Sequence, residues 1–313
     1  MPRKVMVVTT AWGANGGTAG LAAEAIKERN LQTALALLDE AAALRPDVVC
    51  LPEELLIIGV PREHRRALLE PAHGPAFAAL AERARRHGTY VVAGLGELRG
   101  GRRYNTAVLI DRQGHLVGQY DKVQPTDYEV AAGVTPGSGL PVFETDFGKV
   151  GIQICYDIGW PAGWDELGQH GAELVVWPSA YDGGFPLQAY AWRNQYYVVS
   201  SVWTSFGRVI DITGRVLGQT TRSVRLVAQQ IDLEKRLFHT DYNLDKLAQI
   251  RQKLGRSVEI VPYSDENYFT MESHDAAWPV GRIAREWEME TFREYHARAT
   301  CVQDEAQEAA AHR

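Results

Sequence analysis

The sequence predicts an α/β protein whose sheets are covered by helices on their outer faces. Several strand-like segments are apolar on both faces, as at residues 48–51 and 174–177, which is typical of strands buried between layers. Segments with helical spacing alternate with them, as at residues 21–45 and 75–87. No linker or clear repeat interrupts the alternation, so we expect a single domain up to about Leu233.

The first half of this domain begins with a strand at residues 5–10. A glycine-rich segment at 13–20 follows, and because it contains no lysine it is not a phosphate-binding P-loop. Pro46 ends the first helix before the strand at 48–51, and Gly88 closes the second helix. The strands expected next are residues 90–95, 104–111 and 115–120, the last two joined by a tight turn.

The second half contains a long loop at residues 122–139, and loops of that length in compact domains are usually functional. A second loop is expected at 178–186. The other elements expected are a hairpin of strands at 142–145 and 149–155, helices at 162–170 and 187–195, and strands at 174–177 and 197–202. Two more strands are expected after these, through Ile231.

From Glu234 onward the composition shifts to charged, helix-forming residues. Helices are expected at residues 241–254 and 280–300. One face of the second would carry Ile283, Trp287, Phe292 and Tyr295. Large aromatic side chains on one helix face favour packing, so we expect residues 234–313 to pack on the body or on another subunit.

Composition excludes several classes of partner. The net charge of −6 argues against a nucleic-acid surface, which needs clustered Lys and Arg. No apolar run reaches the ~18 to 20 residues that span a bilayer, and the N-terminus lacks the apolar region of a signal peptide. The three cysteines, Cys50, Cys155 and Cys301, are far apart and odd in number, which fits a reducing, cytoplasmic location. The nine histidines show no i, i+4 pair, so we expect no metal site.

Three strand ends carry polar residues, and strand ends are where ligand sites form in α/β sheets. Glu53 follows the strand at 48–51, Lys122 ends one strand, and Cys155 ends another. A carboxylate can take the thiol proton, while a lysine and a nearby helix N-terminus favour the thiolate. Each residue alone is also compatible with an ordinary role, since an isolated Glu or Lys is usually solvated and a free cysteine is often buried in a core.

Six ordered segments together resemble the nitrilase superfamily of carbon–nitrogen hydrolases. Three resemble its signature segments: Leu-Pro-Glu at 51–53, Tyr-Asp-Lys-Val at 120–123 and Gly-Ile-Gln-Ile-Cys-Tyr-Asp at 151–157. Three supporting segments lie at 104–111, 177–180 and 193–199. The resemblance covers roughly residues 5–233, and it identifies residues 1–233 as the hydrolase domain and 234–313 as a C-terminal extension.

The resemblance implies a four-layer α-β-β-α sandwich and a catalytic triad of Glu53, Lys122 and Cys155. Glu54 is the adjacent alternative, but the acid of the family follows the proline directly. A second glutamate of the family lies after the lysine. Glu129 is the candidate for it, and Asp127 is the alternative.

The activity implied is thiol-dependent hydrolysis of a non-peptide C–N bond through a thioester, without metal or organic cofactor. Nitrile-cleaving relatives usually carry Trp and Glu after the cysteine, whereas this chain has Tyr156 and Asp157. We therefore expect a small linear amide or an N-carbamoyl compound as substrate. The substrate-binding candidates are Tyr156, Asp157, Trp160 and Tyr181, with Trp203 as a further apolar wall. Arg193 is a weaker candidate for a substrate carboxylate, with a structural salt bridge as the alternative.

Other interpretations stay open at this stage. The same triad could hydrolyse nitriles, or the chain could be a non-catalytic ligand-binding member of the fold. Gly94-Leu95-Gly96 after a strand resembles the start of a dinucleotide-binding motif, but no helix follows, and residues 94–101 fit a hairpin loop better. Relatives in the superfamily often pair through their sheets, so a homodimer or a larger even assembly is expected, with no nucleic-acid or membrane partner.

Overall fold

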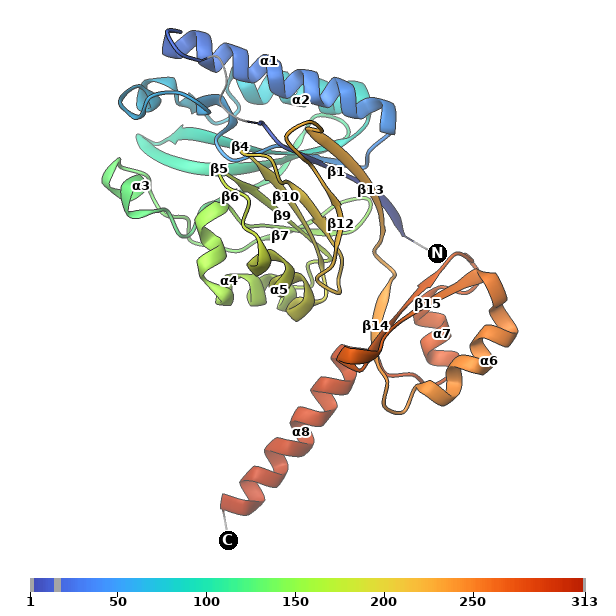
Figure 1. Cartoon of the computed structure of the whole chain (residues 1–313). Coiled ribbons are helices and arrows are strands. Elements are labelled where there is room, and N and C mark those ends of the chain that lie inside the picture. The colour runs from blue at the N-terminus through green and yellow to red at the C-terminus, as the bar shows by residue number, and fades with distance from the viewer. Residues whose placement is uncertain (1–2, 14–17, 312–313) are drawn as a thin grey trace. The chain divides into compact units, whose positions relative to one another are not determined.

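The computed structural model describes residues 3–13 and 18–311, which form two compact units (Figure 1). The first comprises Val5–Ile231, and the second combines the start of the chain with the segment from Asp232 onward. Part of the glycine-rich segment expected at 13–20, residues 14–17, lies outside the described residues.

The larger unit is built on two mixed sheets. The first sheet has the strand order β13-β1-β2-β4-β5-β6, with β3 paired to β4, and the second has the order β12-β11-β10-β9-β8-β7. The first sheet contains β1 (Lys4–Thr10), β2 (Val48–Cys50), β3 (Glu70–Pro71), β4 (Tyr90–Arg99), β5 (Arg102–Ile110), β6 (Leu116–Asp121) and β13 (Leu226–Asp232). The second contains β7 (Val142–Glu144), β8 (Lys149–Ile152), β9 (Leu174–Ser179), β10 (Tyr197–Val202), β11 (Arg208–Ile210) and β12 (Val216–Gln219).

Helices cover the outer face of each sheet. Helices α1 (Ala23–Ala41) and α2 (Pro75–His87) share one buried apolar core with the first sheet, and α4 (Pro161–Gln169) and α5 (Phe185–Asn194) share another with the second (Figure 1). The four-layer α-β-β-α sandwich implied by the resemblance is thus confirmed. Burial of apolar surface in these two cores is the main source of stability.

The inner faces of the two sheets meet through small hydroxyl side chains. Thr10 donates to the carbonyl of Cys50 at 2.8 Å, and Ser201 donates to the carbonyl of Thr10 at 2.9 Å. Thr9 and Ser200 are likewise fully buried there. Small residues let the sheets approach closely, and each buried hydroxyl is compensated by a hydrogen bond.

One expected loop is instead part of a strand. β4 runs through Gly94 and Gly96 to Arg99, so the hairpin loop expected at residues 94–101 is wrong and the turn is confined to its last two residues. A Cβ at Gly94 would lie 2.5 Å from the Cα of Glu53. The glycine is therefore explained by a neighbouring backbone passing over the strand, and not by a turn.

The C-terminal unit is not only helical. Its strands β14 (Arg236–His239), β15 (Val258–Tyr263) and β16 (Tyr268–Ser273) form an antiparallel sheet in the order β14-β16-β15, which the sequence analysis missed. Helices α6 (Leu244–Leu254) and α7 (Val280–Glu286) pack on this sheet in a separate core. Lys4 pairs with Asp232 at 2.9 Å within the same unit.

The single helix expected at residues 280–300 is two helices. α7 ends at Glu286, Glu288 has a left-handed φ of 49°, and α8 (Phe292–Ala311) begins after this break. The aromatic face expected on one helix is therefore divided. Trp287 packs on the core of the unit, and Tyr295 stacks on His239 at 4.4 Å between ring centroids.

Candidate active site

Glu53, Lys122 and Cys155 each lie just beyond the end of a different strand. Glu53 follows β2, where the Gly94 N–H donates to the Pro52 carbonyl at 3.1 Å and the Trp203 indole donates to the Glu53 carbonyl at 2.5 Å. Lys122 follows β6, and its N–H donates to the Asn105 carbonyl of β5 at 2.9 Å. These backbone hydrogen bonds fix where each side chain starts.

The lysine ammonium lies between two carboxylates. Lys122 Nζ donates to Glu53 Oε1 at 2.8 Å and to Glu129 Oε2 at 2.9 Å, although the lysine side chain is only 1% exposed. The amide of Asn105 donates to Glu53 Oε1 and to Glu129 Oε1, both at 2.8 Å. Glu129 sits in the short helix α3 (Asp127–Ala131), whose first turn it also caps together with Thr126.

Cys155 opens a tight helical turn over Cys155–Gly159 after the end of β8. Its φ of 44° is left-handed, a conformation that costs a non-glycine residue about 1–3 kcal/mol and that recurs at functional sites. The indole of Trp177 donates to the Cys155 carbonyl at 3.1 Å, and the Ser179 hydroxyl and Ala180 amide hydrogen-bond to the thiol. The thiol side chain is thus held at a strained, well-supported position.

The charges around the thiol do not favour the thiolate, contrary to expectation. Burial raises the pKa of Cys155, the Glu53 carboxylate raises it further, and Lys122 opposes both without overcoming them. One ammonium faces two carboxylates here, so the charged groups in direct contact sum to −1. Burial has the largest effect on the pKa of Lys122 and lowers it, but Glu53, Cys155 and Glu129 together outweigh burial and raise this pKa. At Glu129, burial raises the pKa of the carboxyl, and Lys122 more than offsets this and lowers it. The resting site therefore holds a neutral thiol beside a charged acid–lysine cluster.

The structure distinguishes Glu53 from its alternative Glu54, and Glu129 from its alternative Asp127. Glu54 is also buried, but it has a left-handed φ of 37° and pairs with Arg103 at 3.1 Å, away from Lys122. Burial is the main cause that raises the pKa of the Glu54 carboxyl. Asp127 is exposed and accepts a hydrogen bond from its neighbour Tyr128. Glu53 and Glu129 are thus the acids that contact the lysine.

Three of the expected substrate-binding residues are exposed aromatics. Tyr156 and Trp160 are 43% and 40% exposed and contact each other edge to face at 5.1 Å. Tyr181 contacts Trp177 at 5.4 Å between ring centroids. Its pKa is raised to about 12 by burial first, and then by Cys155 in its deprotonated form and by the Glu53 carboxylate. Tyr181 therefore lies within electrostatic reach of the thiol and the acid.

The two charged candidates, Asp157 and Arg193, are engaged within the protein, and the third aromatic wall expected, Trp203, donates from its indole to the Glu53 carbonyl. Asp157 is 1% exposed, and both of its carboxylate oxygens accept hydrogen bonds from the chain. Arg193 is exposed and forms an ion pair with Asp165 at 2.8 Å, which is the structural alternative considered for it. Both side chains are thus already paired with groups of the chain itself.

The sequence analysis missed two polar residues of the site. Asn105, 1% exposed in the middle of β5, joins the two acids, and Ser179 hydrogen-bonds to the thiol. Both lie in segments that supported the family resemblance. Their signal is a polar side chain inside an otherwise apolar strand, which is costly unless it is paired.

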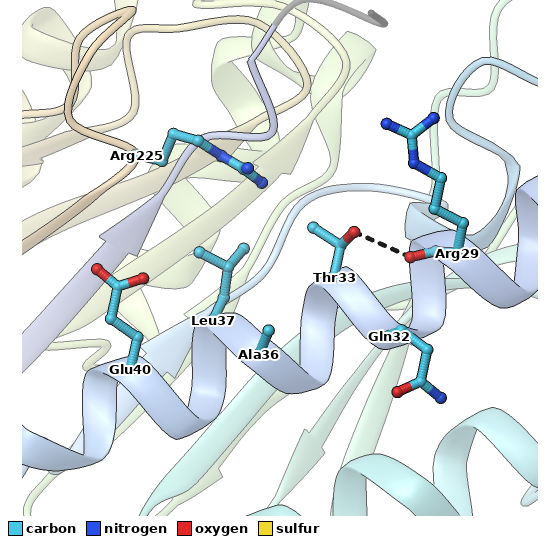
Figure 2. A pocket seen from close by; sticks show the side chains of 7 residues that line it. All are labelled: Arg29, Gln32, Thr33, Ala36, Leu37, Glu40 and Arg225. Atoms are coloured by element: carbon cyan, nitrogen blue, oxygen red, sulfur yellow. Dashed lines mark hydrogen bonds between the residues drawn. The ribbon is translucent and has the colours of Figure 1, made fainter. Parts of the chain in front are cut away.

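A surface groove elsewhere on the unit lacks the chemistry of this site. It has a volume of about 370 Å³ and lies along α1, with Arg225 above the helix (Figure 2). Its Thr33 hydroxyl already donates to the Arg29 carbonyl at 2.9 Å. Within residues 3–13 and 18–311, no cluster of three metal-ligating side chains occurs. In the same part of the chain, no helix is long and apolar enough to cross a membrane.

The chain matches the carbon-nitrogen hydrolase family over residues 18–236 and belongs to it. The resemblance read from the six segments is thus confirmed, and with it the class of reaction, which is hydrolysis of C–N bonds other than peptide bonds. The match begins after β1, covers the remaining elements of the sandwich and ends near the start of the C-terminal unit.

Two curated relatives are amidases. Deaminated glutathione amidase of Bos taurus is 30% identical over 240 residues, covering 66% of this chain and 73% of that protein. Omega-amidase of Mus musculus is 27% identical over 281 residues, covering 81% of this chain and 95% of that protein.

A solved structure shares the fold. It is a mutant amidase from Nesterenkonia sp. AN1 that carries the acetamide moiety of fluoroacetamide on its active site cysteine. The two structures superpose with a TM-score of 0.62 at 21% sequence identity, over 80% of this chain and 95% of the amidase.

Proposed function

We propose that the protein hydrolyses a small linear amide or N-carbamoyl compound through a thioester on Cys155. The contact of Lys122 with both Glu53 and Glu129 beside a buried thiol carries this proposal. Glu53 Oε1 is engaged by Lys122 and Asn105, whereas the buried Oε2 has no hydrogen-bond partner among the described residues. That oxygen is available to take a proton.

The reaction follows from these positions. Glu53 accepts the proton of the thiol as Sγ attacks the carbonyl carbon, and the resulting oxyanion is held by Lys122 and the N–H of Tyr156. The C–N bond then breaks, and the proton on Glu53 passes to the leaving nitrogen. Glu53 next deprotonates a water that attacks the thioester, and the departing sulfur recovers a proton. Because the resting thiol is neutral, the acid must act as a general base during the attack itself.

The position and charge of Arg65 favour a substrate that carries a carboxylate at one end. Its Nε donates to the Val60 carbonyl at 3.0 Å, and the guanidinium lies 5.8 Å from the ring of Trp203, the residue that contacts the Glu53 backbone. Burial lowers the pKa of Arg65, while the charge of Glu54 opposes this. Arg65 forms no ion pair with any described residue, so its charge is available to a carboxylate.

Ammonia release across a panel of substrates tests the proposal. The panel holds linear amides with and without a terminal carboxylate, N-carbamoyl amino acids and nitriles. We expect turnover of at least one amide or carbamoyl compound, a loss of ~10³-fold or more in Cys155→Ser, and little change in the matched variant Cys301→Ser. Turnover of nitriles alone would contradict the substrate class, and equal loss in both cysteine variants would contradict the nucleophile.

We further propose that the protein acts as a homodimer or larger even assembly in a reducing compartment such as the cytoplasm. The exposed aromatic side chains of Trp160 and Phe185, 40% and 75% exposed, support a contact surface, and the required thiol supports the compartment. Light scattering of the purified protein measures the subunit number, and a monomer at micromolar concentration would exclude the assembly.

A further inference from the structure

Asp157 is a buried carboxylate that the reaction does not use. Its Oδ2 accepts hydrogen bonds from the Ile154 N–H and the Tyr120 hydroxyl, both at 2.8 Å, and its Oδ1 accepts from the Gln124 N–H at 2.8 Å. Three donors converge on one carboxylate that is 1% exposed. Such a group is fully occupied by the protein, so its role is to hold the donors.

The donors flank the two reacting side chains. Tyr120 and Gln124 stand on either side of Lys122, while Ile154 directly precedes Cys155. The backbone of Asp157 is also fixed, since its N–H donates to the Ile154 carbonyl at 3.0 Å and its carbonyl accepts from the Trp164 indole at 3.2 Å. One side chain thus joins the lysine segment to the thiol turn, which belong to different sheets.

We propose that Asp157 is a positioning residue that, together with Tyr120, sets the separation of Lys122 from Cys155. The inference rests on the proposed function, in which the lysine holds the oxyanion formed when the thiol attacks. A displacement of about 1 Å between such groups can cost on the order of 100-fold in rate. Loss of the connection therefore lowers the rate of the chemical step more than the binding of substrate.

The charge of Asp157 provides a readout that a purely structural role would lack. Burial raises the pKa of Asp157 to about 6, and the hydrogen bonds from Ile154, Tyr120 and Gln124 and the charge of Lys122 oppose this. Tyr120 and Lys122 are the titratable groups that act on this carboxyl. Below its pKa the protonated group can no longer accept all three hydrogen bonds, so the connection weakens. Removal of the Tyr120 hydroxyl removes one of the opposing hydrogen bonds and moves this transition to higher pH.

The experiment compares Tyr120→Phe, Asp157→Asn and Tyr190→Phe. Tyr190 is the matched control because its buried hydroxyl donates to the Ile158 carbonyl of the same thiol turn at 2.7 Å but reaches no residue of the lysine segment. For each folded variant, kcat and KM are measured as functions of pH. The rate of Cys155 alkylation by iodoacetamide is measured as well, which needs no identified substrate.

We expect Asp157→Asn to lower kcat about 10-fold or more with KM changed less than about 3-fold, and Tyr190→Phe to leave both unchanged. Tyr120→Phe should lower kcat less and shift the acid limb of its pH profile upward. Alkylation should follow the same order. Unchanged kcat in Asp157→Asn, an unshifted acid limb in Tyr120→Phe, or equal effects of the two tyrosine variants would each overturn the inference. If no amide is turned over but alkylation follows this order, the proposed function fails and the positioning role stands.

Discussion

At the scale of single residues, the site is governed by charge balance in a buried place. Lys122 is neutralised by two carboxylates, so it stabilises the acids and leaves the thiol protonated. A lysine between two acids is oriented by both, and its direction is fixed before substrate binds. In the proposed reaction, the thiol is activated only when Glu53 takes its proton.

Substitutions of the neighbouring acids Glu53 and Glu54 should have different effects, the first mainly on activity and the second mainly on stability. Glu53→Gln should lower kcat about 10²–10⁴-fold with little change in Tm, because the base is lost while Lys122 keeps Glu129 as its counter-charge. Glu54→Gln should instead lower Tm, since breaking a buried ion pair costs about 3–5 kcal/mol. Steady-state kinetics and thermal unfolding of both variants check this. A larger loss of kcat in Glu54→Gln would assign the base to the other acid.

Asp157 should make stability depend on pH in a defined direction. Its pKa in the folded protein is about 6, above the usual value for aspartate, so the folded state holds the proton more tightly than the unfolded chain. The contribution of this group to stability is present at about pH 4 and is lost as the pH rises through 6. Relative to Asp157→Asn, the wild type should lose about 2–3 kcal/mol between these values, measured by urea unfolding at each pH. An unchanged difference between the two proteins would show that the carboxyl titrates normally.

At the scale of elements, close approaches between backbone segments decide where the proposed catalytic side chains point. The Glu53 backbone crosses β4 at Gly94, where any Cβ would lie within 2.7 Å of three backbone atoms of the acid segment. The helical turn at Cys155–Gly159 and the short helix α3 then bring the thiol and Glu129 to the same place. The segment expected as a loop at 122–139 contains this helix, whose capping box was readable as Thr126 followed by Glu129.

Gly94→Ala should displace the acid segment. The added methyl group meets backbone that cannot move without shifting Glu53, so we expect a marked fall in Tm and a loss of activity of 10-fold or more in the folded fraction. Gly88→Ala is the control, because its φ of 63° is strained for alanine by about 1–2 kcal/mol but no atom lies within 4 Å of the new methyl group. Comparable activities for the two variants would show that the crossing does not position the acid.

At the scale of the whole molecule, the chain forms two units with separate apolar cores. The cores around α1 and α2 and around α4 and α5 draw only on residues before Ile231, whereas the core around α6 and α7 begins at Phe238. Each unit therefore buries its own apolar surface. The predicted boundary at residue 233 falls beside the division at Asp232.

A chain ending at residue 235 should fold and retain amide hydrolysis. Both cores of the sandwich and the pairing of β13 with β1 are kept in it. Circular dichroism, Tm and kcat of the truncated and full-length proteins check this. Loss of kcat with a retained fold would assign the C-terminal unit a part in the site or in an assembly that completes it.

The sequence by itself determined the α/β class and most element positions, and it predicted Glu53, Lys122 and Cys155 as the candidate triad. Periodicity and turn residues are local signals, and the segments around the three residues are contiguous, so both can be read along the chain. Only the tertiary structure decided the rest. Glu54 pairs with Arg103, and Asn105 donates to both Glu53 and Glu129. Asp157 accepts hydrogen bonds from three donors within the chain. The tertiary structure also decided the protonation of the thiol, because burial and the sum of neighbouring charges depend on groups that are distant in sequence and close only after folding.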